Sequence, residues 1–184
     1  FDTLRTPGLP RQRLIGAGQE LSKQLAMLIK VDDANQAVPS HYYWRSSTYE
    51  KYTGRGWATD ATNVVDYQAG EQTTSESTPA QRLVRQQVQI IGNLGKMVYA
   101  TGTLVSADHN FQVEWRSQAD GDLFGASIEA NVYQVESLVP VVSEPELRVA
   151  GNNYPDWIRM RYLNLPGDVP ERVLTLARDL TTTA

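Results

Sequence analysis

The sequence predicts a mainly β protein: an antiparallel β-sandwich or barrel-like domain with short C-terminal helices. Short stretches alternate apolar and polar residues with period two, and turns rich in Gly, Asn and Asp separate them. Helical spacing of apolar residues begins only after residue 143. Many short strands followed by a helical end are typical of an antiparallel domain with appended helices. We therefore expect a lead-in at residues 1–20, a β domain at 21–143, and a linker and helix at 144–184.

The first part of the β domain contains two expected strands. In QLAMLIKV, the residues Leu25, Met27, Ile29 and Val31 share one face at period two. Residues 41–49 predict the next strand, and residues 48–52 a short turn. The extended chain resumes at GWAT, after glycines that suit a tight turn.

The second part contains four more candidate strands. Residues 66–81 are poor in apolar side chains and predict a long solvated loop before RLVRQQVQII. KMVYATGTLV carries Gly102, where we expect a bend or bulge. In FQVEWR, we expect Phe111, Val113 and Trp115 on one face and the polar residues on the other. The turn QADGD and the strand NVYQVESLVPVV complete the series.

Residues 144–184 predict helices. EPELRVAG fits one or two helical turns, and a short helix is expected around residues 155–161. DVPERVLTLARDL carries helix-start signals: Asp168 as the N-cap, Glu171 three residues later and Pro170 in the first turn. Its apolar stripe needs a partner surface. The stripe consists of Val173, Leu176, Ala177 and Leu180.

Composition excludes several function classes. The formal net charge of −4 and pI of about 5.2 argue against nucleic-acid binding, which usually needs a basic surface. The chain has no cysteine, so it has no disulfide, thiolate zinc site or cysteine nucleophile. No apolar run is long enough to span a bilayer. Because the chain begins with Phe and no signal peptide follows, we expect a segment of a longer polypeptide.

Motifs for catalysis or cofactor binding are missing. Neither G-x-S-x-G nor S-x-x-K occurs, and the short glycine pairs do not form a dinucleotide loop. His41 and His109 lack metal-ligand spacing, and we expect the neighbours Asp108 and His109 to face apart. Carboxylate pairs for glycoside hydrolysis meet only in the fold, so they stay open, as does an autonomous hydrolase. We expect no catalytic, cofactor-binding or metal site and no cofactor.

Residues 41–57, HYYWRSSTYEKYTGRGW, hold two of the four Trp and four of the nine Tyr residues. Exposed and flat, these rings would suit a carbohydrate- or cell-wall-binding module; buried, they would form the core of the sheet. We expect Trp44 and Trp57 to be mainly core residues. The alternative binding module would use the exposed rings of Tyr42, Trp44, Tyr49, Tyr52 or Trp57.

Two stretches resemble bacterial membrane-anchored transglutaminase-like proteins. YYWRSSTYEKYTGRGW resembles their Y-W-R-x-x-x-Y-x-x-Y-x-G-x-G-W segment, although Ser46 stands where Gly is expected. RYLNLPGDVPERVLTLARDLT resembles the segment just before their catalytic core, and the Y-x-V-x-S-x-V-P pattern of residues 133–140 fits between them. The matching residues are Tyr43, Trp44, Arg45, Tyr49, Tyr52, Gly54, Gly56, Trp57, Tyr162, Leu163, Leu165, Pro166, Pro170, Arg172, Val173, Leu176, Ala177 and Thr181.

The resemblance implies a non-catalytic, extracytoplasmic accessory domain that precedes a papain-like Cys-His-Asp core. It would support or orient that core or its substrate, and the stripe-bearing helix would be the first helix of the core. The parent would be a transglutaminase- or cysteine-protease-like enzyme, anchored by membrane helices outside this segment. Its partners would be the core of the same polypeptide and a cell-envelope protein or glycan. We expect no nucleic-acid partner and no membrane insertion by this segment.

Overall fold

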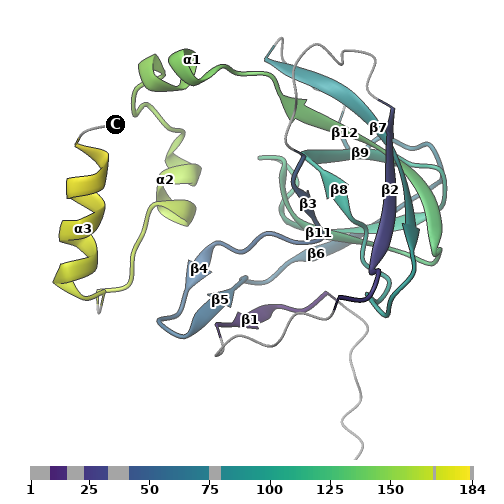
Figure 1. Cartoon of the computed structure of the whole chain (residues 1–184), viewed down its shortest axis with the longest axis horizontal. Coiled ribbons are helices and arrows are strands. Elements are labelled where there is room, and N and C mark those ends of the chain that lie inside the picture. The colour runs from purple at the N-terminus through teal and green to yellow at the C-terminus, as the bar shows by residue number, and fades with distance from the viewer. Residues whose placement is uncertain (1–8, 16–22, 33–41, 75–79, 168, 183–184) are drawn as a thin grey trace, which may run out of the picture. The chain divides into compact units, whose positions relative to one another are not determined.

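The computed structural model describes residues 9–15, 23–32, 42–74, 80–167 and 169–182. Within them lie twelve strands in antiparallel sheets and three helices (Figure 1), and none of the described sheets closes into a barrel. The mainly β, sandwich-like class is therefore confirmed. The strands are β1 (Gln12–Leu14), β2 (Met27–Asp32), β3 (Trp44–Arg45), β4 (Lys51–Tyr52), β5 (Gly56–Ala58), β6 (Asn63–Tyr67), β7 (Gln81–Ile90), β8 (Ala100–Thr101), β9 (Thr103–Ala107), β10 (Phe111–Ser117), β11 (Asp122–Ile128) and β12 (Val132–Pro140).

The chain forms two compact units. The first comprises Phe1–Leu9, Gly18–Thr48 and Ala61–Gly151, and the second comprises Pro10–Ala17, Tyr49–Asp60 and Asn152–Ala184. The second unit thus draws on three separate parts of the sequence. The expected division at residues 20 and 143 stays a prediction.

The first unit is built on a four-stranded sheet in the order β2-β7-β12-β9 and a three-stranded sheet in the order β11-β10-β6. The β7–β12 pairing runs without a break from Gln81↔Pro140 to Gln89↔Val132. Alternation explains β7, where Val84 and Val88 are buried while Arg85 and Gln87 are exposed. Each strand thus offers one apolar face to the core.

One continuous core joins the two sheets. It includes Val88 and Tyr133 from the four-stranded sheet and Tyr67, Val113 and Trp115 from the three-stranded sheet. Val88 and Val113 have no exposed surface. Burying a side chain of this kind contributes about 1.5–3 kcal/mol each, so this layer is the main stabilising feature of the unit.

Several predicted strands are confirmed. Strand β2 has Met27, Ile29 and Val31 on its more buried face, and Leu25 precedes it. The bend at Gly102 separates β8 from β9, and the hairpin at residues 118–122 joins β10 to β11. Strand β12 also lies where the sequence places it.

Other boundaries that the sequence predicted are wrong. The expected strand at 41–49 is reduced to β3, and His41 lies outside the described residues. The expected turn at 48–52 contains β4, because Lys51 and Tyr52 pair with β5. The expected loop at 66–81 is shorter: β6 continues to the buried Tyr67 and β7 begins at Gln81. Residues 75–79 within it lie outside the described chain.

The second unit contains the sheet β1-β5-β4 and two of the three helices. The helices are α1 (Glu144–Val149) in the first unit, and α2 (Asp156–Tyr162) and α3 (Glu171–Thr181) in the second. No helix among the described residues is long and apolar enough to cross a bilayer.

Helix α3 begins later than the sequence predicts. Pro170 occupies the N-cap position with ψ 135° and provides no side-chain cap. That extended backbone delays the first helical residue to Glu171, so Glu171 does not close a capping box. The predicted cap Asp168 lies outside the described residues.

We predict that Gly102→Ala destabilises the first unit more than Gly121→Ala does. Both glycines have φ 67°, so each substitution meets the left-handed penalty of about 1–2 kcal/mol. A Cβ at Gly102 would also lie 2.2 Å from the Leu138 carbonyl oxygen, whereas nothing lies within 4 Å at Gly121. We expect urea unfolding to show a further loss of about 1–3 kcal/mol for Gly102→Ala. Equal losses would contradict the steric argument.

Candidate functional site

The aromatic stretch at residues 41–57 is divided between the two units. Tyr43 and Trp44 belong to the first and are 79% and 36% exposed, whereas Trp57 belongs to the second and is 43% exposed. The prediction that Trp44 and Trp57 are core residues is wrong. Their strands are two and three residues long and lie outside the two stacked sheets. Trp115, in the central strand β10, is the tryptophan that the core buries.

Trp44 is fixed by a buried glutamine. Its Nε1–H donates to Gln86 Oε1 at 2.8 Å, and the Thr101 N–H donates to the same oxygen at 3.0 Å. Gln86 Nε2 donates to Ser137 Oγ at 3.1 Å. Gln86 is only 2% exposed, so these bonds offset the cost of burying its amide. The polar edge of Trp44 is therefore occupied while part of its ring remains exposed.

Residues 44–48 form a strap between the two sheets. At one end, Trp44 and Arg45 pair with β8. At the other end, Ser47 bridges to Gly125 of β11, and the Thr48 N–H donates to the Phe124 carbonyl at 2.9 Å. The strap therefore pairs through its backbone with β8, which precedes β9 of the four-stranded sheet, and with β11, an edge strand of the three-stranded sheet.

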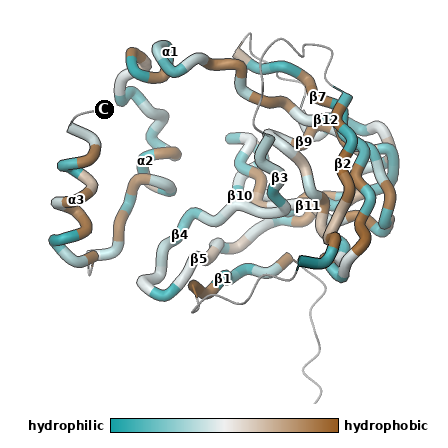
Figure 2. Tube along the Cα trace, in the orientation of Figure 1, coloured by the Kyte–Doolittle hydropathy of each residue, from teal (hydrophilic) through white to brown (hydrophobic). Residues whose placement is uncertain are grey.

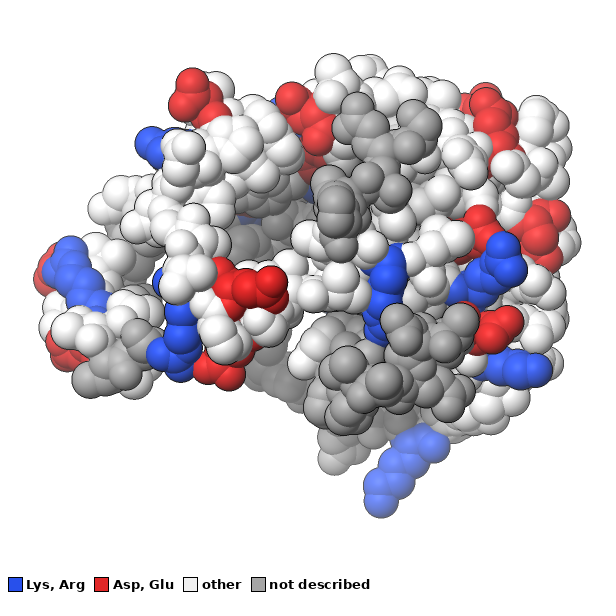
Figure 3. Space-filling model, turned by 90° about the horizontal axis from the view of Figure 1, so that it is seen from above, with Lys and Arg blue, Asp and Glu red and all other residues white. Residues whose placement is uncertain are grey.

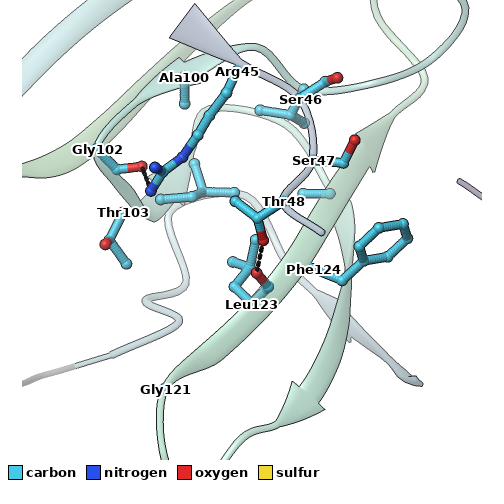
Figure 4. Close-up of a pocket in the computed structure, with 13 residues that line it drawn as sticks. Arg45, Ser46, Ser47, Thr48, Ala100, Gly102, Thr103, Gly121, Leu123 and Phe124 are labelled. Carbon is cyan, nitrogen blue, oxygen red and sulfur yellow. Dashed lines mark hydrogen bonds between the residues drawn. The ribbon is translucent and has the colours of Figure 1, made fainter. Parts of the chain in front are cut away.

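A small cavity of about 70 Å³ adjoins the strap (Figure 4). The Arg45 side chain reaches toward Gly102 and donates to its carbonyl at 3.2 Å. The lining combines apolar side chains with the hydroxyls of Ser46, Ser47 and Thr103, but it contains no carboxylate or imidazole. Ligand pockets usually measure about 300–1,000 Å³, so this space suits a few water molecules rather than a cofactor.

Arg116 holds the other end of the strap. Its Nη2 lies 2.7 Å from Asp122 Oδ1, and the two side chains are only 2% and 4% exposed. The Arg116 Nη1 donates to the Thr48 carbonyl at 2.7 Å, and Nη2 donates to Thr48 Oγ1 at 2.8 Å. The guanidinium also lies 5.8 Å from the centroid of the Phe124 ring. This buried ion pair thus fixes the strap to the β10–β11 hairpin.

Glu114 is also buried, contrary to the expectation that the polar residues of FQVEWR face away from the core. Its Oε1 accepts from the Leu9 N–H at 3.0 Å and its Oε2 from Thr62 Oγ1 at 2.8 Å. Strand β10 lies between β11 and β6, and chain segments cover its outer face as well. Glu114 therefore ties two peripheral segments to the sheet.

His109 lies beside Asp108 in an exposed turn. Contrary to expectation, His109 Nδ1 lies 2.8 Å from Asp108 Oδ1, but both side chains are well exposed in a turn. Among the described residues, no group of three or more His, Asp and Glu side chains is arranged to hold a metal ion. His41 lies outside them.

In the second unit, the β1-β5-β4 sheet carries a row of large side chains. Arg13 pairs with Trp57 and Trp57 pairs with Tyr52, so the three lie side by side on one face. The Tyr52 and Trp57 ring centroids are 5.3 Å apart, with an interplanar angle of 55°. At the end of the sheet, Leu14 and Ile15 are 74% and 63% exposed.

The sheet has its own polar anchors. Glu50 is 8% exposed, and its Oε1 accepts from Thr59 Oγ1 at 3.2 Å and from the Asp60 N–H at 2.6 Å. The Tyr49 hydroxyl donates to the Pro10 carbonyl at 2.7 Å. These bonds connect residues 10–15 to residues 49–60. Tyr49 therefore fixes the chain, whereas Trp57 offers ring surface to solvent.

Acidic and basic side chains are interspersed elsewhere. In the view of Figure 3, Lys and Arg side chains lie among Asp and Glu side chains. No broad patch of one sign covers the described part of that face. On that face the two signs of charge are mixed and are not separated into a basic and an acidic region.

The comparisons with known proteins identify no relative: no family model, curated protein or solved structure matches the chain. The features that sequence reasoning missed are Gln86, Glu114 and the Arg116–Asp122 pair. The clearest sequence signal is that of Gln86, which occupies an inward position between Val84 and Val88.

We predict that Arg116→Met destabilises the protein by about 3–5 kcal/mol, because it leaves Asp122 buried without the guanidinium. A matched control is Arg85→Met, which removes a more exposed ion pair with Glu136 and should destabilise the protein much less, because water already solvates both charges. Urea unfolding of both variants measures the difference. A small effect at Arg116 would show that the ion pair does not hold the strap.

We also predict a loss of stability at high pH from Tyr133. Burial raises the pKa of Tyr133 from 10.0 to about 12, partly opposed by the bond that its hydroxyl accepts from the Tyr99 N–H. Above its ordinary pKa, the unfolded chain loses this proton while the folded chain retains it. The stability that the protonated Tyr133 hydroxyl contributes is therefore present in full below pH 10. It is lost as the pH rises to about 12. That loss is roughly 2–3 kcal/mol.

The measurement is urea unfolding at about pH 8 and about pH 11, with Tyr133→Phe as the test variant and Tyr43→Phe as the control. Tyr43 is largely exposed, so Tyr43→Phe controls for the loss of a tyrosine hydroxyl outside the core. Tyr133→Phe should reduce the loss between the two pH values. An unchanged loss would assign the alkaline instability to other groups.

Proposed function

We propose that this chain is a non-catalytic, extracytoplasmic accessory domain of a transglutaminase-like membrane protein. It supports or orients a papain-like Cys-His-Asp core of the same polypeptide, or helps to present the substrate of that core. The basis is the resemblance of residues 43–57 and 162–181 to segments of that family. The catalytic residues and the membrane anchors belong to the parent protein outside this segment.

The observation that carries the proposal is the exposed apolar stripe of α3. Val173, Leu176 and Leu180 are 48%, 58% and 65% exposed, although they recur at helical spacing. Figure 2 shows hydrophobic segments, in brown, that recur along α3. A stripe of this kind normally faces a core. An isolated helix of eleven residues is only marginally stable in water. Helix α3 would therefore gain most of its stability from a surface that covers the stripe. The proposed occupant is the transglutaminase-like core.

A second candidate function is a carbohydrate- or cell-wall-binding module. It is favoured by the exposure of Tyr43, Trp44 and Trp57. Against it, the ring pairs Tyr42–Trp44 and Tyr52–Trp57 are tilted by 44° and 55° and do not form flat platforms. Protection of Trp fluorescence from acrylamide by a cell-wall glycan would favour this candidate.

We predict that α3 is protected from hydrogen exchange only in a longer polypeptide. In the 184-residue chain, its amides should exchange with protection below about tenfold. Adding the polypeptide encoded after Ala184 should raise protection across Glu171–Thr181. Leu176→Asp should abolish this rise in protection. Thr175→Asp makes the same change of charge on the opposite face of the helix and should leave the rise intact.

The 184-residue chain should also show no amine transfer to protein glutamine and no peptidase activity. Clear turnover by this chain would contradict the proposal. So would a longer polypeptide that contains no Cys-His-Asp domain, or one that leaves α3 unprotected.

A further inference from the structure

The sheet β1-β5-β4 differs in charge from the chain as a whole. Residues 10–15 and 49–60 carry four basic side chains (Arg11, Arg13, Lys51, Arg55) and two acidic ones (Glu50, Asp60), a formal charge of +2. The whole chain carries −4. Basic charge is therefore concentrated on the sheet while the remainder of the chain is acidic.

The two acidic groups of this sheet are already engaged. Asp60 lies 3.7 Å from the Lys51 ammonium, and Glu50 accepts bonds from Thr59 and Asp60. Within the described residues, neither Arg13 nor Arg55 contacts a carboxylate. The sheet thus presents two arginines whose charge can pair with an external anion.

Exposed apolar side chains accompany these arginines. Arg13 lies next to Trp57 and Tyr52 in one cross-strand row. The Ile15 N–H donates to the Arg55 carbonyl at 2.9 Å, which continues the same pairing by one step. Leu14 and Ile15 line a hollow together with Tyr52, Gly54 and Arg55. The largest exposed aliphatic surfaces of the sheet therefore lie beside its basic side chains.

This combination indicates the interface of a lipid bilayer. Trp and Tyr favour the headgroup level, aliphatic side chains the acyl boundary, and Arg the phosphates of anionic lipids. A glycan site would instead use flat rings with hydrogen-bonding neighbours, and it would gain little from Leu14 and Ile15. Along β1, Leu14 points to the face opposite Arg13 and Ile15. The apolar and basic side chains therefore come together only at the end of the sheet, where Leu14, Ile15 and Arg55 line one hollow. We propose that this end of the β1-β5-β4 sheet docks on the surface of a bilayer that contains anionic phospholipid, through Arg13, Leu14, Ile15, Arg55 and Trp57. This role does not require a catalytic core.

The test is flotation of the purified 184-residue chain with vesicles of phosphatidylcholine that contain phosphatidylglycerol, and with vesicles of phosphatidylcholine alone. We expect binding to the anionic vesicles that weakens as salt is added. Arg13→Gln and Arg55→Gln should each lower the partition coefficient about fivefold. Arg148→Gln, which removes the same charge from α1, should have little effect.

A second set of variants tests how much the apolar side chains contribute to vesicle binding. Leu14→Ser combined with Ile15→Ser should lower binding about tenfold or more at constant charge. The control Leu28→Ser lies on β2 of the first unit at 50% exposure and should bind like the unaltered chain. All these positions are exposed, and equal thermal unfolding would confirm that the variants fold.

Tryptophan fluorescence measures how deeply Trp57 enters the bilayer. Lipids brominated in the acyl chain should quench part of the Trp emission, and Trp57→Phe should remove that part, because Trp115 is buried in the core, Trp44 belongs to the first unit and Trp157 lies on α2. The proposal is overturned by failure to bind anionic vesicles, by equal losses in the control variants, or by quenching that survives Trp57→Phe. Binding to cell-wall glycan in place of vesicles would overturn it in favour of the second candidate function.

Discussion

The buried Arg116–Asp122 ion pair is the constraint on which the strap between the two sheets depends. Removing a guanidinium and a carboxylate from water costs several kcal/mol each, and their attraction offsets this cost only with good geometry and further hydrogen bonds. Here the bonds from Arg116 to the carbonyl and hydroxyl of Thr48 supply them. The pair therefore fixes the point at which the chain leaves the first unit, since the next residue, Tyr49, belongs to the second.

The strap is held at its other end by a neutral group. Gln86 accepts from Trp44 and from the Thr101 backbone, and it donates to Ser137. An amide suits this position because it accepts and donates without the desolvation cost of a charge. With Arg116 at one end and Gln86 at the other, the short segment 44–48 needs few apolar contacts of its own. This explains how Trp44 stays partly exposed in a strap that is held at both ends.

Period-two alternation predicted β7, β10 and β12 because each has one face against a continuous core. It did not predict β11, where small residues around Gly125 interrupt the pattern. A Cβ at Gly125 would lie 2.5 Å from the Leu9 side chain and 2.7 Å from the Ser46 carbonyl. Glycine is therefore required at position 125 because the strap, which is distant in sequence, packs directly against it. Alternation places Gln86 inward, but the burial of Glu114 and Arg116 depends on partners distant in sequence, so alternation alone could not place these two residues.

The two exposed surfaces of the second unit differ in chemistry, and this difference assigns them different occupants. The α3 stripe is aliphatic, without a basic side chain among Val173, Leu176 and Leu180, and such a surface gains most from a close-packed protein interior. The sheet mixes arginines with Trp57, Leu14 and Ile15, and burial in a dry protein interface would leave those charges unpaired. A hydrated bilayer surface solvates the guanidinium groups while accepting the apolar side chains. Under the two proposals, this chain contacts a catalytic core through a helix and a membrane surface through a sheet, and neither contact needs a pocket.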